Sequence, residues 1–157
     1  MKTLIAFFAL SISLCAQDRT MDIRGYTLEL GMTMEQVWDN LKTDLNVIEE
    51  SDGNFYLSDK HNAPVGIIIF KDEKAVKIIK DWGTSYTSNV GQVFKTLWKI
   101  FKQYDKDLDA VKVIPLETFS PKGDKTTLQF YLTDNRFLDI SIQHKVTIYE
   151  VIEEKVD

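Results

Sequence analysis

The amino-acid sequence predicts an α+β fold of two tandem repeats, each with one helix and several antiparallel strands, and with the helices packed on one face of the sheet. Three observations support this class. Two capped helical segments share one pattern, each is followed by a similar β-hairpin, and the second hairpin ends with alternating apolar and polar residues. We place repeat one at about 26–83 and repeat two at about 87–153, within a single domain over residues 22–157. The alternative is a chance similarity between two helix-then-strand segments.

The two helical segments begin alike. Thr33 and Asn89 are residue types that favour the N-cap of a helix, and each is followed three positions later by a glutamine that can bond back to the cap. Apolar residues then take the i, i+1, i+4 spacing of one helix face. Both segments therefore predict an amphipathic helix, with these core positions: Val37, Trp38 and Leu41 in the first, and Val93, Phe94 and Leu97 in the second.

Strand patterns fill the rest of each repeat. Residues 67–79 and 129–141 each hold two β-rich runs around a polar turn, which predicts a hairpin. From Leu138 to Gln143 apolar and polar residues alternate, so one face of that strand should be buried and the other solvated. Further strands are predicted at 26–30, 54–57, 110–119 and 145–153, and a loop at 120–125.

Residues 1–16 have the pattern of a cleavable signal peptide. Lys2 gives a positive start, residues 4–14 carry no charge, and Asp18 ends the apolar stretch. The stretch is shorter than the ~20 apolar residues that a permanent membrane span needs. A buried N-terminal helix is the alternative. We therefore expect the protein to be exported, and to be periplasmic, associated with the envelope, or secreted.

Cys15 leaves two processing routes open. Small residues around it fit plain cleavage after Cys15, Ala16 or Gln17, whereas lipidation of Cys15 would tether a water-soluble domain to a membrane surface. Lipoprotein processing normally requires a small residue before the cysteine, and Leu14 is not small, so we expect plain cleavage. Because Cys15 is the only cysteine in the chain, the mature domain should contain no intramolecular disulfide.

The composition is that of an ordinary globular protein. Hydrophobic residues make up 44% of the 157 residues and charged residues 27%, with a formal net charge of −5. Acidic and basic residues are interspersed along the chain. Because phosphate binding needs a clustered basic face, this distribution argues against nucleic acid as a partner.

Two segments resemble a family of small exported bacterial proteins. The run Leu30-Gly-Met-Thr-Met-Glu-Gln-Val37 is similar to the start of the helical unit in the SmpA/OmlA outer-membrane lipoproteins and in the fold-related β-lactamase inhibitor protein. The hairpin Phe70-Lys-Asp-Glu-Lys-Ala-Val76 resembles their strand turn, and the tandem arrangement is closer to the inhibitor protein. The resemblance implies a binding module that scaffolds envelope proteins or blocks an enzyme. It assigns no binding residue to this chain, because no functional motif matches.

The sequence contains no pattern typical of a catalytic, cofactor or metal site. The two histidines, His61 and His144, have no partner at metal-ligand spacing, and we interpret both as surface residues. The sequence lacks a nucleophile motif and a phosphate-binding glycine loop. Adjacent acids such as Glu153 and Glu154 would point to opposite faces of a strand. We therefore expect a protein without cofactor or bound metal that is not an enzyme.

Aromatic residues that lie close together in the middle of the sequence are the candidate partner-binding residues. They are Trp82, Tyr86, Trp98 and Tyr104. Burial in the core is the more ordinary role for such large rings. If the rings are exposed, they would suit an interface, because tryptophan and tyrosine are enriched among residues that dominate binding energy.

The leading hypothesis is a non-enzymatic binding or scaffolding protein, with a protein inhibitor as one form of it. Its partner would be another exported or envelope protein, and a membrane would be involved only if Cys15 is lipidated. The first alternative is a carrier of a small ligand held between helices and sheet. The second is an enzyme that uses carboxylates which the sequence does not identify.

Overall fold

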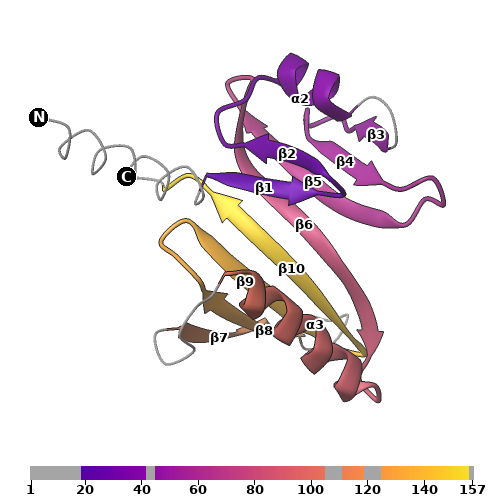
Figure 1. The fold of residues 1–157 in the computed structure, drawn as a ribbon, viewed down its shortest axis with the longest axis vertical. Helices are drawn as coiled ribbons and strands as arrows, with labels where there is room; N and C mark the ends of the chain where they lie inside the picture. The colour runs from indigo at the N-terminus through magenta and orange to yellow at the C-terminus, as the bar shows by residue number, and fades with distance from the viewer. Residues whose placement is uncertain (1–18, 42–44, 105–110, 119–124, 156–157) are drawn as a thin grey trace, which may run out of the picture. The chain divides into compact units, whose positions relative to one another are not determined.

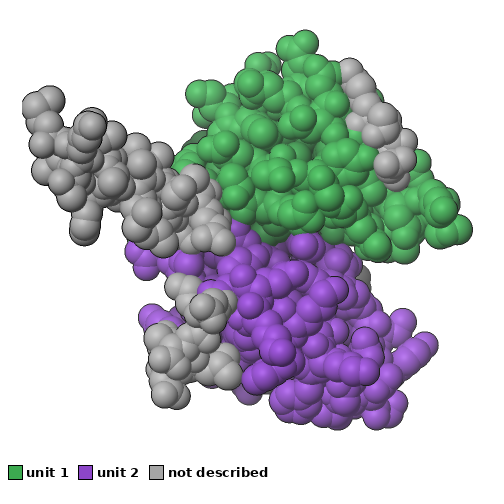
Figure 2. All heavy atoms as spheres, viewed as in Figure 1, with its two compact units in different colours: residues 1–78, 152–157 green, residues 79–151 purple. Residues whose placement is uncertain are grey.

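The computed structural model describes residues 19–41, 45–104, 111–118 and 125–155. The predicted signal peptide, Cys15 and most of the predicted loop at 120–125 lie outside these described residues. The chain divides into two compact units (Figure 2). Unit 1 comprises Met1–Ile78 and Ile152–Asp157, and unit 2 comprises Ile79–Val151. Each unit is described in turn.

Unit 1 combines a short helix with short antiparallel strands (Figure 1). Its elements are β1 (Thr20–Ile23), β2 (Tyr26–Glu29), α2 (Met34–Leu41), β3 (Asn46–Glu49), β4 (Phe55–Ser58), β5 (Pro64–Lys71) and the first part of β6 (Lys74–Tyr86). β1 pairs with β2 as a two-stranded sheet, while β3, β4, β5 and β6 follow one another in the larger sheet. The β5–β6 hairpin confirms the prediction for residues 67–79. Its two turn residues, Asp72 and Glu73, both have positive φ, as a tight two-residue hairpin turn requires.

Unit 2 places one long helix on antiparallel strands (Figure 1). After the second part of β6, its elements are α3 (Val90–Gln103), β7 (Lys112–Thr118), β8 (Lys125–Tyr131), β9 (Arg136–Ile142) and β10 (Lys145–Glu153). β10 has the predicted bounds, and β8 and β9 form the second predicted hairpin. The last two residues of β10, Ile152 and Glu153, belong to unit 1.

The predicted α+β class, with helices packed on a sheet in two tandem repeats, is wrong because the fold is mostly β. The described residues form ten strands and two helices. Eight strands make one antiparallel sheet in the order β3-β4-β5-β6-β10-β9-β8-β7. The helix of the first supposed repeat has only 8 residues, and the strand after its hairpin turn runs for 13. The sequence analysis also missed two strands, at 20–23 and 46–49.

The two helices differ in how they begin. At α2 the Thr33 hydroxyl accepts a bond from the backbone N–H of Gln36 (3.2 Å), and the Gln36 side chain accepts one from the N–H of Thr33 (2.9 Å). This reciprocal capping box confirms the prediction for the first segment. At α3 the N-cap residue Asn89 makes no side-chain cap bond. Asn89 is therefore the N-cap residue, as predicted, but the predicted cap bond is absent, and α3 depends on packing instead.

Each unit has its own apolar core. In unit 1, α2 contributes Val37 and Leu41 to a core that also holds β-strand residues such as Leu28 and Ile68, and Ile152 from the end of the chain. In unit 2 the fully buried residue of α3 is Ile100. It packs among side chains of β9, β10 and the turn before β9: Leu132, Leu138, Ile140, Val146 and Ile148.

The two caps provide a matched test of this account. Replacing Thr33 with alanine should lower the free energy of unfolding by about 1 kcal/mol, because a cap bond is lost. Replacing Asn89 with alanine should lower it by clearly less, because Asn89 makes no such bond. Urea denaturation of both variants measures the difference. Equal losses would contradict the assigned caps.

Candidate functional site

The most exposed aromatic side chains of unit 2 lie on α3 and at the end of the strand before it. Tyr86, at the end of β6, is 67% exposed, and Val90, Phe94 and Trp98 on the helix are 53%, 65% and 58% exposed. The three helical residues are four positions apart, so they form one line along the helix. We call these four residues the α3 surface.

The face of α3 that adjoins this row is packed on the core. Ile100 is fully buried, and four other residues of the helix region pack partly buried against the same core: Val93, Leu97, Phe101 and Tyr104. The α3 surface is therefore apolar area that the core of unit 2 does not cover. Such area on a well-anchored helix is a common feature of interaction sites.

Lysines surround the α3 surface. The helix carries Lys95, Lys99 and Lys102 and has no acidic residue between Val90 and Gln103. The Lys102 ammonium lies 5.7 Å from the centre of the Trp98 ring, and the Lys145 ammonium lies 5.2 Å from that of Tyr86. These cation–π contacts hold positive charge directly against the exposed rings.

A buried ionic cluster fixes α3 on the sheet. The Glu150 side chain in β10 is 1% exposed and pairs with that of Arg136 in β9, which is 3% exposed. Arg136 Nη1 and the Tyr104 hydroxyl both donate to Glu150 Oε1. Trp82 Nε1 donates to Glu150 Oε2 over 2.9 Å, and Arg136 Nη1 also donates to the Tyr104 hydroxyl over 2.7 Å. We call these four residues the Glu150 cluster.

The chemistry of the Glu150 cluster is that of a structural support. Burial, and then the neighbouring Glu150 carboxylate, raise the pKa of the Tyr104 phenol, so it remains a protonated donor. The carboxylate accepts three bonds, which compensates for the cost of removing a charge from water. Members of the cluster come from β6, β9, β10 and the C-cap of α3, so the cluster ties the helix end to three strands.

The four predicted partner-binding residues fall into two pairs. Tyr86 and Trp98 lie exposed on the α3 surface. Trp82 and Tyr104 are partly buried in the Glu150 cluster, where their polar atoms bond the carboxylate. The ammonium groups of Lys80 and Lys99 lie over the Trp82 ring, at 4.3 and 5.4 Å from its centre.

Several residues lie elsewhere than predicted, or were not predicted at all. Phe94 and Trp38 were assigned to the core, but Phe94 is exposed, and Trp38 is 42% exposed. Glu150 and Arg136 were missed. One sequence signal was available, because Glu150 occupies the buried face of β10 together with Val146, Ile148 and Ile152. An acid within a buried alternation predicts a paired charge.

The histidines do not form a site in the structure. His61 and His144 are exposed and lie in turns. The Asp59 carboxylate accepts bonds from the backbone N–H groups of Ala63 and His61, and these bonds lower its pKa. Within the described ranges, no three His, Cys, Asp or Glu side chains are placed so that they could share a metal ion.

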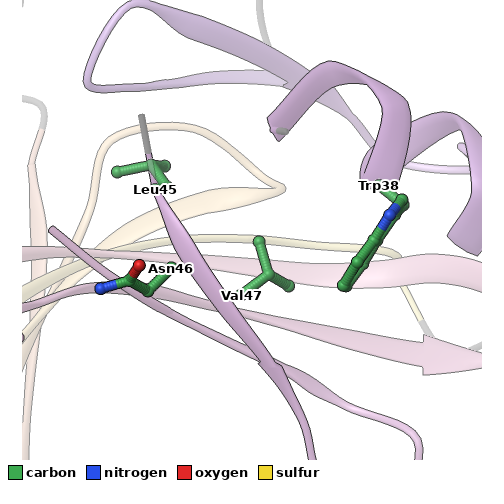
Figure 3. Close-up of a pocket in the computed structure, with 4 residues that line it drawn as sticks. All are labelled: Trp38, Leu45, Asn46 and Val47. Atoms are coloured by element: carbon green, nitrogen blue, oxygen red, sulfur yellow. The ribbon is translucent and has the colours of Figure 1, made fainter. Parts of the chain in front are cut away.

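A hollow of about 260 Å³ opens beside α2 in unit 1 (Figure 3). Its lining residues are Trp38, Leu45, Asn46 and Val47. Trp38 extends from α2 beside Val47 of β3, and the Trp38 and Phe55 ring centres are 5.7 Å apart in an edge-to-face contact. The volume lies below the ~300–1,000 Å³ typical of small-molecule pockets.

Comparison with protein-family models, with curated proteins and with solved structures gives no match for this chain. The resemblance to the SmpA/OmlA lipoproteins and the β-lactamase inhibitor protein therefore stays a prediction. Neither described helix has the length and apolar character to span a bilayer.

Removing the central carboxylate tests the Glu150 cluster. Glu150→Ala should lower the free energy of unfolding by about 3–5 kcal/mol, because it withdraws the charge that compensates a buried guanidinium. The control is Glu153→Ala in the same strand, which breaks the half-exposed 2.6 Å ion pair with Lys77. That variant should lose less than about 1 kcal/mol in the same denaturation experiment. Similar losses in both variants would show that the cluster does not anchor the helix.

Proposed function

We propose that this chain is an exported, non-enzymatic binding or scaffolding protein that binds another exported or envelope protein through the α3 surface. The carrying observation is the row of exposed apolar side chains on a helix whose adjoining face is already packed in a core. Exposed Tyr86 and Trp98 support the proposal, because these residue types are enriched among those that dominate interface energies. The signal-peptide pattern supports export. A protein inhibitor is one form that such a binding protein can take.

A carrier of a small ligand is the second candidate function. The hollow beside Trp38 favours it, because three of its four lining side chains are apolar. Its volume favours a single side chain over a whole ligand. The α3 surface is therefore the better supported site.

The proposal is tested by presenting the purified protein to an extract of exported and envelope proteins and comparing three forms. These are the wild type, Phe94→Ser/Trp98→Ser on α3, and Ile48→Ser/Tyr56→Ser. Ile48 and Tyr56 are neighbouring exposed apolar residues of unit 1, so they form a matched control. A protein retained by the wild type and the control should be lost by the α3 variant.

Affinity of the purified partner gives the decisive measurement. Truncating an anchor residue costs more than about 1 kcal/mol of binding free energy. The variant that truncates both Phe94 and Trp98 should therefore bind at least about tenfold more weakly, while the affinity of the control variant stays within about twofold of the wild type. All four substituted positions are exposed, so the variants should fold like the wild type, which circular dichroism verifies. No specific partner, or equal affinity in all three forms, would rule out the proposed function.

A further inference from the structure

The two units carry charges of opposite sign. The sequence of unit 1 holds fifteen acidic and nine basic residues, a net charge of −6. That of unit 2 holds nine acidic and ten basic residues, a net charge of +1. Within unit 2, positive charge gathers beside the α3 surface, because α3 carries three lysines and no acidic residue and Lys145 lies against Tyr86. A surface of this kind attracts an acidic partner.

The complementary chemistry lies on unit 1, around α2. This helix carries Glu35 and Asp39 and no basic residue, and Trp38 between them is exposed. Glu49 of β3 is exposed and pairs with Phe55, the residue that contacts the Trp38 ring. Cross-strand partners share one face of a sheet, so this third acid belongs to the same side. We call Glu35, Trp38, Asp39, Glu49 and the adjoining hollow the α2 surface.

The shapes of the two surfaces also match. The α3 surface projects two rings, Phe94 and Trp98, from a convex helix. The α2 surface offers a hollow of about 260 Å³ with apolar walls from Trp38, Leu45 and Val47. A hollow of that size suits one inserted aromatic side chain. Aromatic pairs contribute roughly 0.5–1.5 kcal/mol beyond the area they bury, so insertion beside Trp38 would add to the charge attraction.

We infer that the α3 surface of one copy docks onto the α2 surface of a second copy, with lysines against carboxylates and an aromatic ring in the hollow. The inference rests on the proposed function in one respect, because it uses α3 as the docking surface. Each copy carries both surfaces, so the contact is head-to-tail and can repeat. A few side chains cover much less than the ~800 Å² per partner of a standard interface, so association is weak and depends on concentration and salt.

Sedimentation velocity of the purified protein tests the inference. In low salt, the weight-average mass of the wild type should rise between low and high micromolar concentration, and high salt should suppress the rise. Lys95→Glu/Lys102→Glu on α3 and Glu35→Lys/Asp39→Lys on α2 should each stay monomeric. An equimolar mixture of these two variants should regain the concentration-dependent rise in weight-average mass, because each reversed surface then meets an opposite charge.

A matched control carries the same change in charge elsewhere. Lys112→Glu/Lys125→Glu alters two exposed lysines on β7 and β8, outside the α3 surface, and should associate like the wild type. A wild type that stays monomeric at every concentration would overturn the inference. The inference would also be overturned if the Lys95→Glu/Lys102→Glu and Glu35→Lys/Asp39→Lys variants each still associated like the wild type. A monomeric wild type that sediments with phosphatidylglycerol vesicles would show that the basic surface meets a lipid instead.

The two proposals fail separately. Suppose that the wild type is monomeric and binds another protein, and that the Phe94→Ser/Trp98→Ser variant does not bind it. Self-association is then wrong and the proposed function stands. If self-association is found and no other protein binds, the proposed function is wrong in its partner, and α3 is an interface between copies.

Discussion

The carboxylate of Glu150 is the point on which the arrangement of unit 2 depends. It is buried, so it must be paired, and its partners come from three other elements: Trp82 in β6, Arg136 in β9 and Tyr104 at the end of α3. Such bonds are directional, whereas apolar packing is not. The cluster therefore defines which side of α3 faces the sheet. Because that side of the helix faces the sheet, Phe94 and Trp98 remain exposed.

Local patterns predicted individual elements better than they predicted the class of fold. The alternation in β10 and the turn at Asp72-Glu73 are encoded within a few residues, so both were predicted. The class was wrong because the strands at 20–23 and 46–49 are only four residues long, which is too short for a pattern to identify them. β6 also continues to Tyr86, beyond residue 79 where the predicted hairpin ends, and it includes Gly83 with a φ of 106°.

The candidate site shows a similar division. Periodicity identifies α3 as amphipathic, but its apolar residues cover a wide arc of the helix. Only tertiary packing separates Val93 and Leu97, which pack on the core, from Phe94 and Trp98, which do not. The likeness between the two helical segments reflects the needs of amphipathic helices. In charge they are opposites, because Asp39 and Lys95 occupy matching places after the exposed aromatic residue.

The division of unit 1 between the two ends of the chain has a consequence for when it can fold. Ile152 is fully buried in the core of unit 1, yet it is separated from the rest of that core by all of unit 2. During synthesis, residues 1–78 are complete long before their last core residue is made, whereas unit 2 is one continuous segment. Unit 1 therefore acquires its complete core only after the last residues of the chain have been made.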